Sequence, residues 1–115
     1  MVLREIVETF QLGVEACGDL LGVEVTGGYA SDLLSDVIAH ARKGDLWVTL
    51  QTHRNTVAVA SMKELAAIVT VNGRRPEEET LASAREEGIP LLVSPLPAFE
   101  LIGRLHGLGL SGMEM

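Results

Sequence analysis

Two kinds of apolar pattern alternate along this chain. Five stretches are predicted to be helices, either because their apolar residues recur at helical spacing or because residues that start helices precede them. They are residues 3–10, 32–43, 55–65, 76–88 and 97–106. Short apolar runs bounded by turn residues predict strands at residues 13–17, 23–26, 46–50, 66–71 and 89–93. Gly27 and Gly28 are expected to end the strand at 23–26.

The order of these elements predicts the fold class. The stretch 55–65 contains Val57-Ala58-Val59-Ala60, which fits a strand by β-branching and a helix by length. We favour a helix there, because residues 66–71 make the better strand. Strands and helices then alternate, which predicts an α/β domain with a mostly parallel sheet and right-handed crossovers. The near-continuous apolar run at 46–50 is typical of a strand buried on both faces of such a sheet.

The amphipathic helices should each bury one face. Ser31 or Asp32 is expected to cap the helix at 32–43, and Gly44 to end it. The residues expected on buried faces are Leu3, Ile6, Val7 and Phe10 in the first helix, Leu33, Leu34, Val37, Ile38 and Ala41 in the second, and Phe99, Leu101, Ile102 and Leu105 in the last.

Composition narrows the class of protein. The 115 residues are 47% hydrophobic and 22% charged, which is typical of a single globular domain spanning residues 1–115. The net charge of −7 argues against nucleic-acid binding. No apolar run approaches the ~20 residues needed to span a membrane. The single cysteine, Cys17, excludes an internal disulfide and favours the cytoplasm.

Polar loops are expected to gather at one edge of the sheet. The carboxyl ends of parallel strands share an edge, where ligands tend to bind, and each loop there precedes a helix. Three of the nine basic residues, Arg54, Arg74 and Arg75, fall in these loops. We therefore expect the loops to bind an anion such as a nucleotide or phosphometabolite. The alternative is that these are ordinary solvated loops and that the glycine pair serves only a turn. The candidate ligand-binding residues are Thr26, Gly27, Gly28, Thr52, His53, Arg54, Asn55, Arg74 and Arg75.

Catalytic and metal-binding patterns are weak in this sequence. No local signature pairs Cys17 with His40, His53 or His106 as a nucleophile and base, and these residues lack metal-ligand spacing. Thr26-Gly27-Gly28 matches neither the dinucleotide fingerprint nor a P-loop. Asp32 would also repel an anion from the helix that follows. We therefore expect no catalytic residues, no metal and no cofactor.

Several segments together resemble the DRTGG domain family. They are residues 25–37 (Val-Thr-Gly-Gly-Tyr-Ala-Ser-Asp-Leu-Leu-Ser-Asp-Val), 44–53, 55–60, 87–92 and 99–101, and they cover nearly the whole chain. The family is named for Asp-Arg-Thr-Gly-Gly, and here the stretch is Glu24-Val25-Thr26-Gly27-Gly28. Val25 thus replaces the arginine, and any contact that the arginine makes in other members is lost.

The resemblance implies a fold and a role. It implies an α/β domain similar to the N-terminal domain of HPr kinase/phosphorylase. It also implies a non-catalytic regulatory module, of the kind found beside CBS domains in bacterial pyrophosphatases or in phosphotransacetylase-like proteins, and a dimer-forming unit. Kinase activity is not expected, because the chain has no Gly-x-x-x-x-Gly-Lys-Ser/Thr motif.

Two functions remain open from the sequence. The first is a regulatory or interaction module that forms a homodimer and docks on another protein. The apolar faces of the helices at 32–43 and 97–106 could pack between subunits as readily as inside one. The alternative is a sensor that binds an anionic small molecule, such as an adenine nucleotide, at the carboxyl edge of the strands. An enzyme is the least expected class.

Overall fold

The computed structural model describes residues 1–113. Its centre is a five-stranded sheet in the order β1-β5-β4-β3-β2. Strands β2 to β5 run parallel, and β1 pairs antiparallel with β5. The predicted mostly parallel α/β sheet is therefore confirmed. The strands are β1 (Gly13–Ala16), β2 (Gly27–Ala30), β3 (Asp45–Thr49), β4 (Ala67–Thr70) and β5 (Leu91–Val93).

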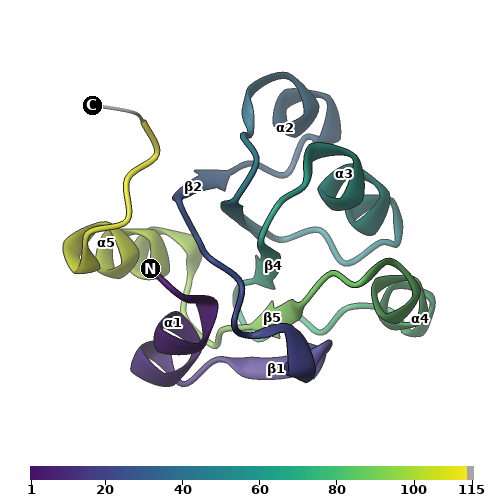
Figure 1. Ribbon diagram of the computed structural model, residues 1–115, viewed down its shortest axis with the longest axis horizontal. Helices are drawn as coiled ribbons and strands as arrows, with labels where there is room; N and C mark the ends of the chain where they lie inside the picture. Colours follow the sequence, from purple (N-terminus) through teal and green to yellow (C-terminus); the bar gives the residue numbers. More distant parts are fainter. Residues whose placement is uncertain (114–115) are drawn as a thin grey trace.

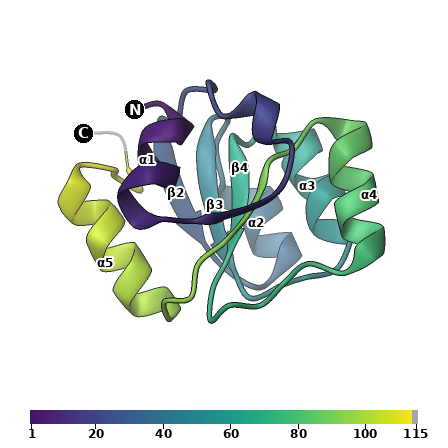
Figure 2. The same cartoon turned by 90° about the horizontal axis from the view of Figure 1, so that it is seen from below.

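Helices cover both faces of this sheet (Figures 1 and 2). Three crossover helices, α2, α3 and α4, lie on one face, and α1 and α5 lie on the other. None of the helices within residues 1–113 is long and apolar enough to cross a membrane. The helices are α1 (Leu3–Phe10), α2 (Leu34–His40), α3 (Asn55–Lys63), α4 (Glu78–Glu87) and α5 (Ala98–Leu108), with a short 3₁₀ turn, η1 (Gly18–Leu20).

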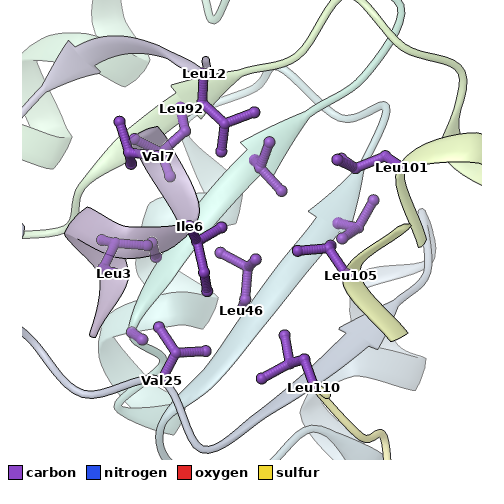
Figure 3. Close-up of a cluster of buried hydrophobic side chains, with 14 of the residues drawn as sticks. Leu3, Ile6, Val7, Leu12, Val25, Leu46, Leu92, Leu101, Leu105 and Leu110 are labelled. Atoms are coloured by element: carbon purple, nitrogen blue, oxygen red, sulfur yellow. The ribbon is translucent and has the colours of Figure 1, made fainter. Parts of the chain in front are cut away.

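Each face of the sheet packs its own apolar core. The core under α1 and α5 includes Ile6, Leu46 and Leu101 (Figure 3). The core under the other three helices is built around Trp47, whose indole Nε1 donates to the Ser31 carbonyl at 2.8 Å. All five residues of β3 are buried, as predicted for a central parallel strand.

Two predicted helices are confirmed with their limits nearly unchanged. The ambiguous stretch 55–65 forms α3, and residues 66–71 contain β4. Helix α4 begins after Pro76 and ends at Gly88, whose φ of 71° is the left-handed value that favours glycine. Gly109 ends α5 in the same way, with φ 113°, so that helix passes through the expected stop at Gly107.

The predicted strand at 23–26 is wrong. Residues 23–25 pair instead with the first residues of the chain: the Val25 N–H donates to the Met1 carbonyl at 2.7 Å, and Glu24 forms an antiparallel bridge with Val2. Strand β2 begins at Gly27, where a strand was expected to end. The polypeptide therefore reaches the carboxyl edge of the sheet at Ser31, and not at Thr26.

Some predicted core residues lie on the surface. Phe99 is 91% exposed and Ile102 is 37% exposed, because α5 docks on the sheet through Leu101 and Leu105. In the shorter α2, Val37 is buried, whereas Leu33 and Ile38 are exposed. Leu33 precedes α2, and neither Ser31 nor Asp32 caps that helix by a side-chain bond at its N-cap position. Gly44 has a φ of 86°, but it belongs to the turn before β3.

Candidate functional site

The loops after β3, β4 and β5 meet at the carboxyl edge of the sheet. The loop after β3 carries Thr52, whose carbonyl accepts from the Glu77 N–H at 3.2 Å and the Thr80 hydroxyl at 2.7 Å. The loop after β4 contacts the loop after β5, since the Asn72 and Gly73 N–H groups donate to the carbonyls of Leu96 and Ser94. These bonds hold the loops together and use polar groups that could otherwise face a ligand.

Asp32 is the central polar residue of this edge. Its Oδ1 accepts from the Thr49 hydroxyl at 2.8 Å and from the Leu50 N–H at 2.7 Å. The Gln51 side chain donates back to the Asp32 carbonyl at 2.9 Å. Asp32 therefore ties the end of β2 to the end of β3. The expected role of Asp32 as a helix cap is therefore wrong. Its bond to Thr49 depends on β2 and β3 being neighbours in the sheet.

A hollow of about 190 Å³ lies beside Asp32. Its walls come from the ends of β2 and β3, from Val71 and from Ala98 at the start of α5. Small-molecule sites usually measure ~300 Å³ or more. This hollow therefore suits a fragment of a ligand and does not enclose a nucleotide.

The basic side chains expected to converge on an anion diverge. Arg54 lies 3.9 Å from Glu79, and Arg75 Nε lies 2.7 Å from Glu15 on β1. Both arginines are largely exposed, so each pair contributes little stability. Among the three arginines of these loops, only Arg74 forms no ion pair within residues 1–113, and it is exposed.

The start of α3 offers few backbone donors to an anion. The Asn55 N–H donates to His53 Nδ1 at 3.2 Å, and the Thr56 N–H and hydroxyl both donate to the His53 carbonyl. The Val57 N–H donates to the Arg54 carbonyl. His53 therefore satisfies the helix start from within the chain.

Thr26, Gly27 and Gly28 lie at the opposite edge, where β2 and β3 begin. The Thr26 hydroxyl donates to the Lys43 carbonyl at 3.3 Å. A Cβ atom placed on Gly27 would lie 2.7 Å from Asp45 Oδ1 and 3.0 Å from the Ser111 carbonyl oxygen. One on Gly44 would collide with the Thr26 hydroxyl. The expected position of these three residues at the carboxyl edge is therefore wrong, because the glycine pair belongs to β2 itself.

Two buried residues, Asp45 and Val25, lie beside this motif. Asp45 is buried, and its Oδ2 accepts from the Arg42 N–H at 2.8 Å; burial raises the pKa of this carboxyl group. Val25, which replaces the arginine of the family motif, is 1% exposed and packs in the core under α1. The motif thus holds the beginnings of β2 and β3 together.

A second polar cluster joins β2 to α2. The Tyr29 hydroxyl donates to Asp36 Oδ2 at 2.8 Å, and His40 Nε2 lies 3.9 Å from Asp36 Oδ1. The hydrogen bond from Tyr29 is the main cause that lowers the pKa of Asp36, and it raises the pKa of Tyr29. Within residues 1–113, no group of three or more His, Cys, Asp or Glu side chains could hold a metal ion.

Cys17 has the environment of a structural thiol. Its Sγ lies 3.3 Å from the Ala84 carbonyl, and burial is the main cause that raises the pKa of this thiol. A nucleophilic cysteine needs a lowered pKa. Cys17 therefore lacks the lowered pKa of an activated thiol.

Two exposed apolar residues, Phe99 and Ile102, lie on α5. We call Phe99, Ile102, Gly103 and His106 the α5 surface; together they line an open hollow of about 340 Å³. Ile102 and His106 also border a hollow of about 240 Å³ between α5, the segment 110–112 and the outer strand β2. Figure 1 shows α5 on the outside of the molecule, away from the three crossover helices. Phe99 and Ile102 were expected to face inward or to pack between subunits, and the structure leaves both exposed on the single chain.

Comparison with known proteins bears on the fold. No protein-family model matches the chain, and no curated protein matches it. A solved structure of the CBS and DRTGG domains of the regulatory region of Clostridium perfringens pyrophosphatase, complexed with the activator diadenosine tetraphosphate, superposes with a TM-score of 0.71 at 14% identity. The match covers 96% of this chain and 48% of that chain. The chain therefore has a DRTGG-like α/β fold, as its sequence resemblance predicts.

Proposed function

We propose that this chain is a non-catalytic regulatory module that works by binding protein surfaces, and that it forms a homodimer. The observation that carries this proposal is the α5 surface, on which Phe99 is 91% exposed. An exposed aromatic beside apolar hollows is typical of an interaction site. The regulatory origin of the structural neighbour supports the same role.

The polar architecture of the carboxyl edge also supports this role. Asp32 bonds to Thr49 and Gln51, and His53 accepts from the Asn55 and Thr56 N–H groups at the start of α3. A catalytic site needs a nucleophile, base or electrophile that is free to meet substrate. The polar groups named above are instead bonded within the fold. Their arrangement therefore favours a docking role over catalysis.

Sedimentation velocity of the wild-type chain from ~1 to ~200 μM tests the homodimer. A sedimentation coefficient that rises from the monomer to the dimer value supports it. A monomer throughout the range contradicts self-association, and capture of a single defined protein partner would then be the remaining form of the docking role.

A smaller version of the anion-sensor hypothesis has its own supporting observation. The loops after β3 and β4 are in contact through Thr52, and Arg74 is exposed in the second of them. The candidate contacts are therefore Thr52, His53, Arg54, Asn55, Arg74 and Arg75, without the glycine motif. The neighbour's complex with diadenosine tetraphosphate suggests adenine nucleotides as probes.

A thermal-shift series with ATP, ADP and diadenosine tetraphosphate tests this second function. A ligand at 100 times its dissociation constant adds roughly 2.7 kcal/mol of stability. An Arg74→Ala variant should lose that shift, whereas Arg85→Ala, on the exposed side of α4, should keep it. A flat wild-type series contradicts the sensor hypothesis for these ligands.

A further inference from the structure

We propose that a second copy of this chain binds to the α5 surface, so that two α5 helices pack antiparallel across a two-fold axis near Gly103. This inference rests on the proposed homodimer and names its interface. A two-fold interface must be complementary to itself, because the same patch is used by both subunits. Three features of α5 meet that requirement.

The first feature is a projecting side chain beside a hollow. Phe99 extends from the first turn of α5, and the hollow along the helix is bordered by Ile102, Gly103 and His106. In an antiparallel pair centred near Gly103, Phe99 of one copy comes opposite His106 of the other. Each copy then supplies the aromatic ring for the hollow of its partner, and both rings leave water.

The second feature is the order of charges along α5. Glu100 and Arg104 lie one turn apart and form an ion pair at 3.1 Å. By the 3.6-residue period they share the flank of the helix that adjoins Gly103 and Gly107. In an antiparallel two-fold pair each flank meets the same flank of the partner. Glu100 of one copy therefore faces Arg104 of the other, twice, and the charges attract.

The third feature is the presence of two glycines, Gly103 and Gly107, within α5. A Cβ atom on Gly103 or Gly107 would meet nothing within 4 Å, so the monomer has no steric need for glycine at either position. Glycine in a helix interior is destabilising relative to alanine. Close approach of a second helix is a reason for glycine at both positions, and it agrees with the apolar and charge patterns.

Sedimentation equilibrium of wild type and variants tests this interface. Phe99→Glu should weaken the dimer by at least about tenfold. Met62→Glu is the matched control, because Met62 is also an exposed apolar residue (59%) but lies on α3. The control should leave the dimer unchanged. Unfolding curves at low concentration confirm that each variant is folded.

Two further variants separate the interface from general surface effects. Gly103→Ala should raise the stability of the monomer and weaken the dimer, which are changes of opposite sign. Glu100→Arg should weaken the dimer by opposing like charges, and the double variant Glu100→Arg, Arg104→Glu should restore it. A wild-type dimer that survives Phe99→Glu and Gly103→Ala overturns this interface but leaves the homodimer standing. A wild-type monomer overturns both.

Discussion

The carboxylate of Asp45 lies 2.7 Å from the point where a Cβ atom on Gly27 would sit. Asp45 cannot move away freely, because its other oxygen accepts from the Arg42 N–H at 2.8 Å. The glycine of the sequence motif is therefore explained by packing at the start of the sheet. The Thr26-Gly27-Gly28 motif, which the sequence suggests as a ligand loop, therefore has a structural role at the start of β2.

Gly27→Ala should destabilise the protein by about 1–3 kcal/mol, because an added methyl group in a filled space forces neighbours apart. Gly28→Ala is the matched control, since a Cβ atom there would make ordinary contacts of 3.5 Å or more. Urea unfolding measures both. Equal stability of the two variants would contradict the packing role of Gly27.

Val25→Arg restores the residue for which the family motif is named, and it should destabilise this chain by about 2–4 kcal/mol. The reason is that Val25 is 1% exposed, and a buried charge without a partner is costly. Val23→Arg places the same charge nearby at a position that is 38% exposed, and it should be nearly neutral. A tolerated Val25→Arg, measured by thermal unfolding, would show that this position opens to solvent.

How far the sequence predicts this fold depends on the distance over which the interactions act. Helical and alternating patterns are local, so the order of elements and the buried strand β3 follow from them. The start of β2 does not, because residues 23–25 pair with the N-terminal segment and Gly27 packs on Asp45. The exposure of Phe99 likewise depends on the angle at which α5 docks.

The candidate site was predictable only in its loops. Parallel strand order places the loops after β3, β4 and β5 at one edge. The directions of the arginine side chains depend on Glu15 and Glu79, which are distant in sequence from Arg75 and Arg54. No pattern in the sequence reveals those pairs.

Asp32→Ala should destabilise the protein by about 1–3 kcal/mol, because the Thr49 hydroxyl and the Leu50 N–H lose their shared acceptor. Glu8→Ala, on the exposed side of α1, removes a carboxylate that forms no such bonds within residues 1–113, and it should change little. Chemical unfolding compares the two. If Asp32→Ala were as stable as Glu8→Ala, Asp32 would not be the tie between β2 and β3.

The lowered pKa of Asp36 makes part of the stability depend on pH. A carboxyl group whose pKa falls on folding stabilises the fold above its unfolded pKa of about 3.8, and this contribution is lost as the pH falls through the folded pKa. Tyr29→Phe removes the main hydrogen bond and should raise the pKa of Asp36 toward 3.8. Carboxyl ¹³C NMR titration measures it, and an unchanged pKa would refute the role of Tyr29.

The central claim is that this module acts through its α5 surface. Backbone amide NMR spectra of the wild-type chain, recorded over a dilution series, test it most directly. The account predicts concentration-dependent shifts at residues 99–107, with the loops at 52–55 and 72–75 unchanged. Shifts confined to those loops, or spectra that do not change with concentration, would contradict it.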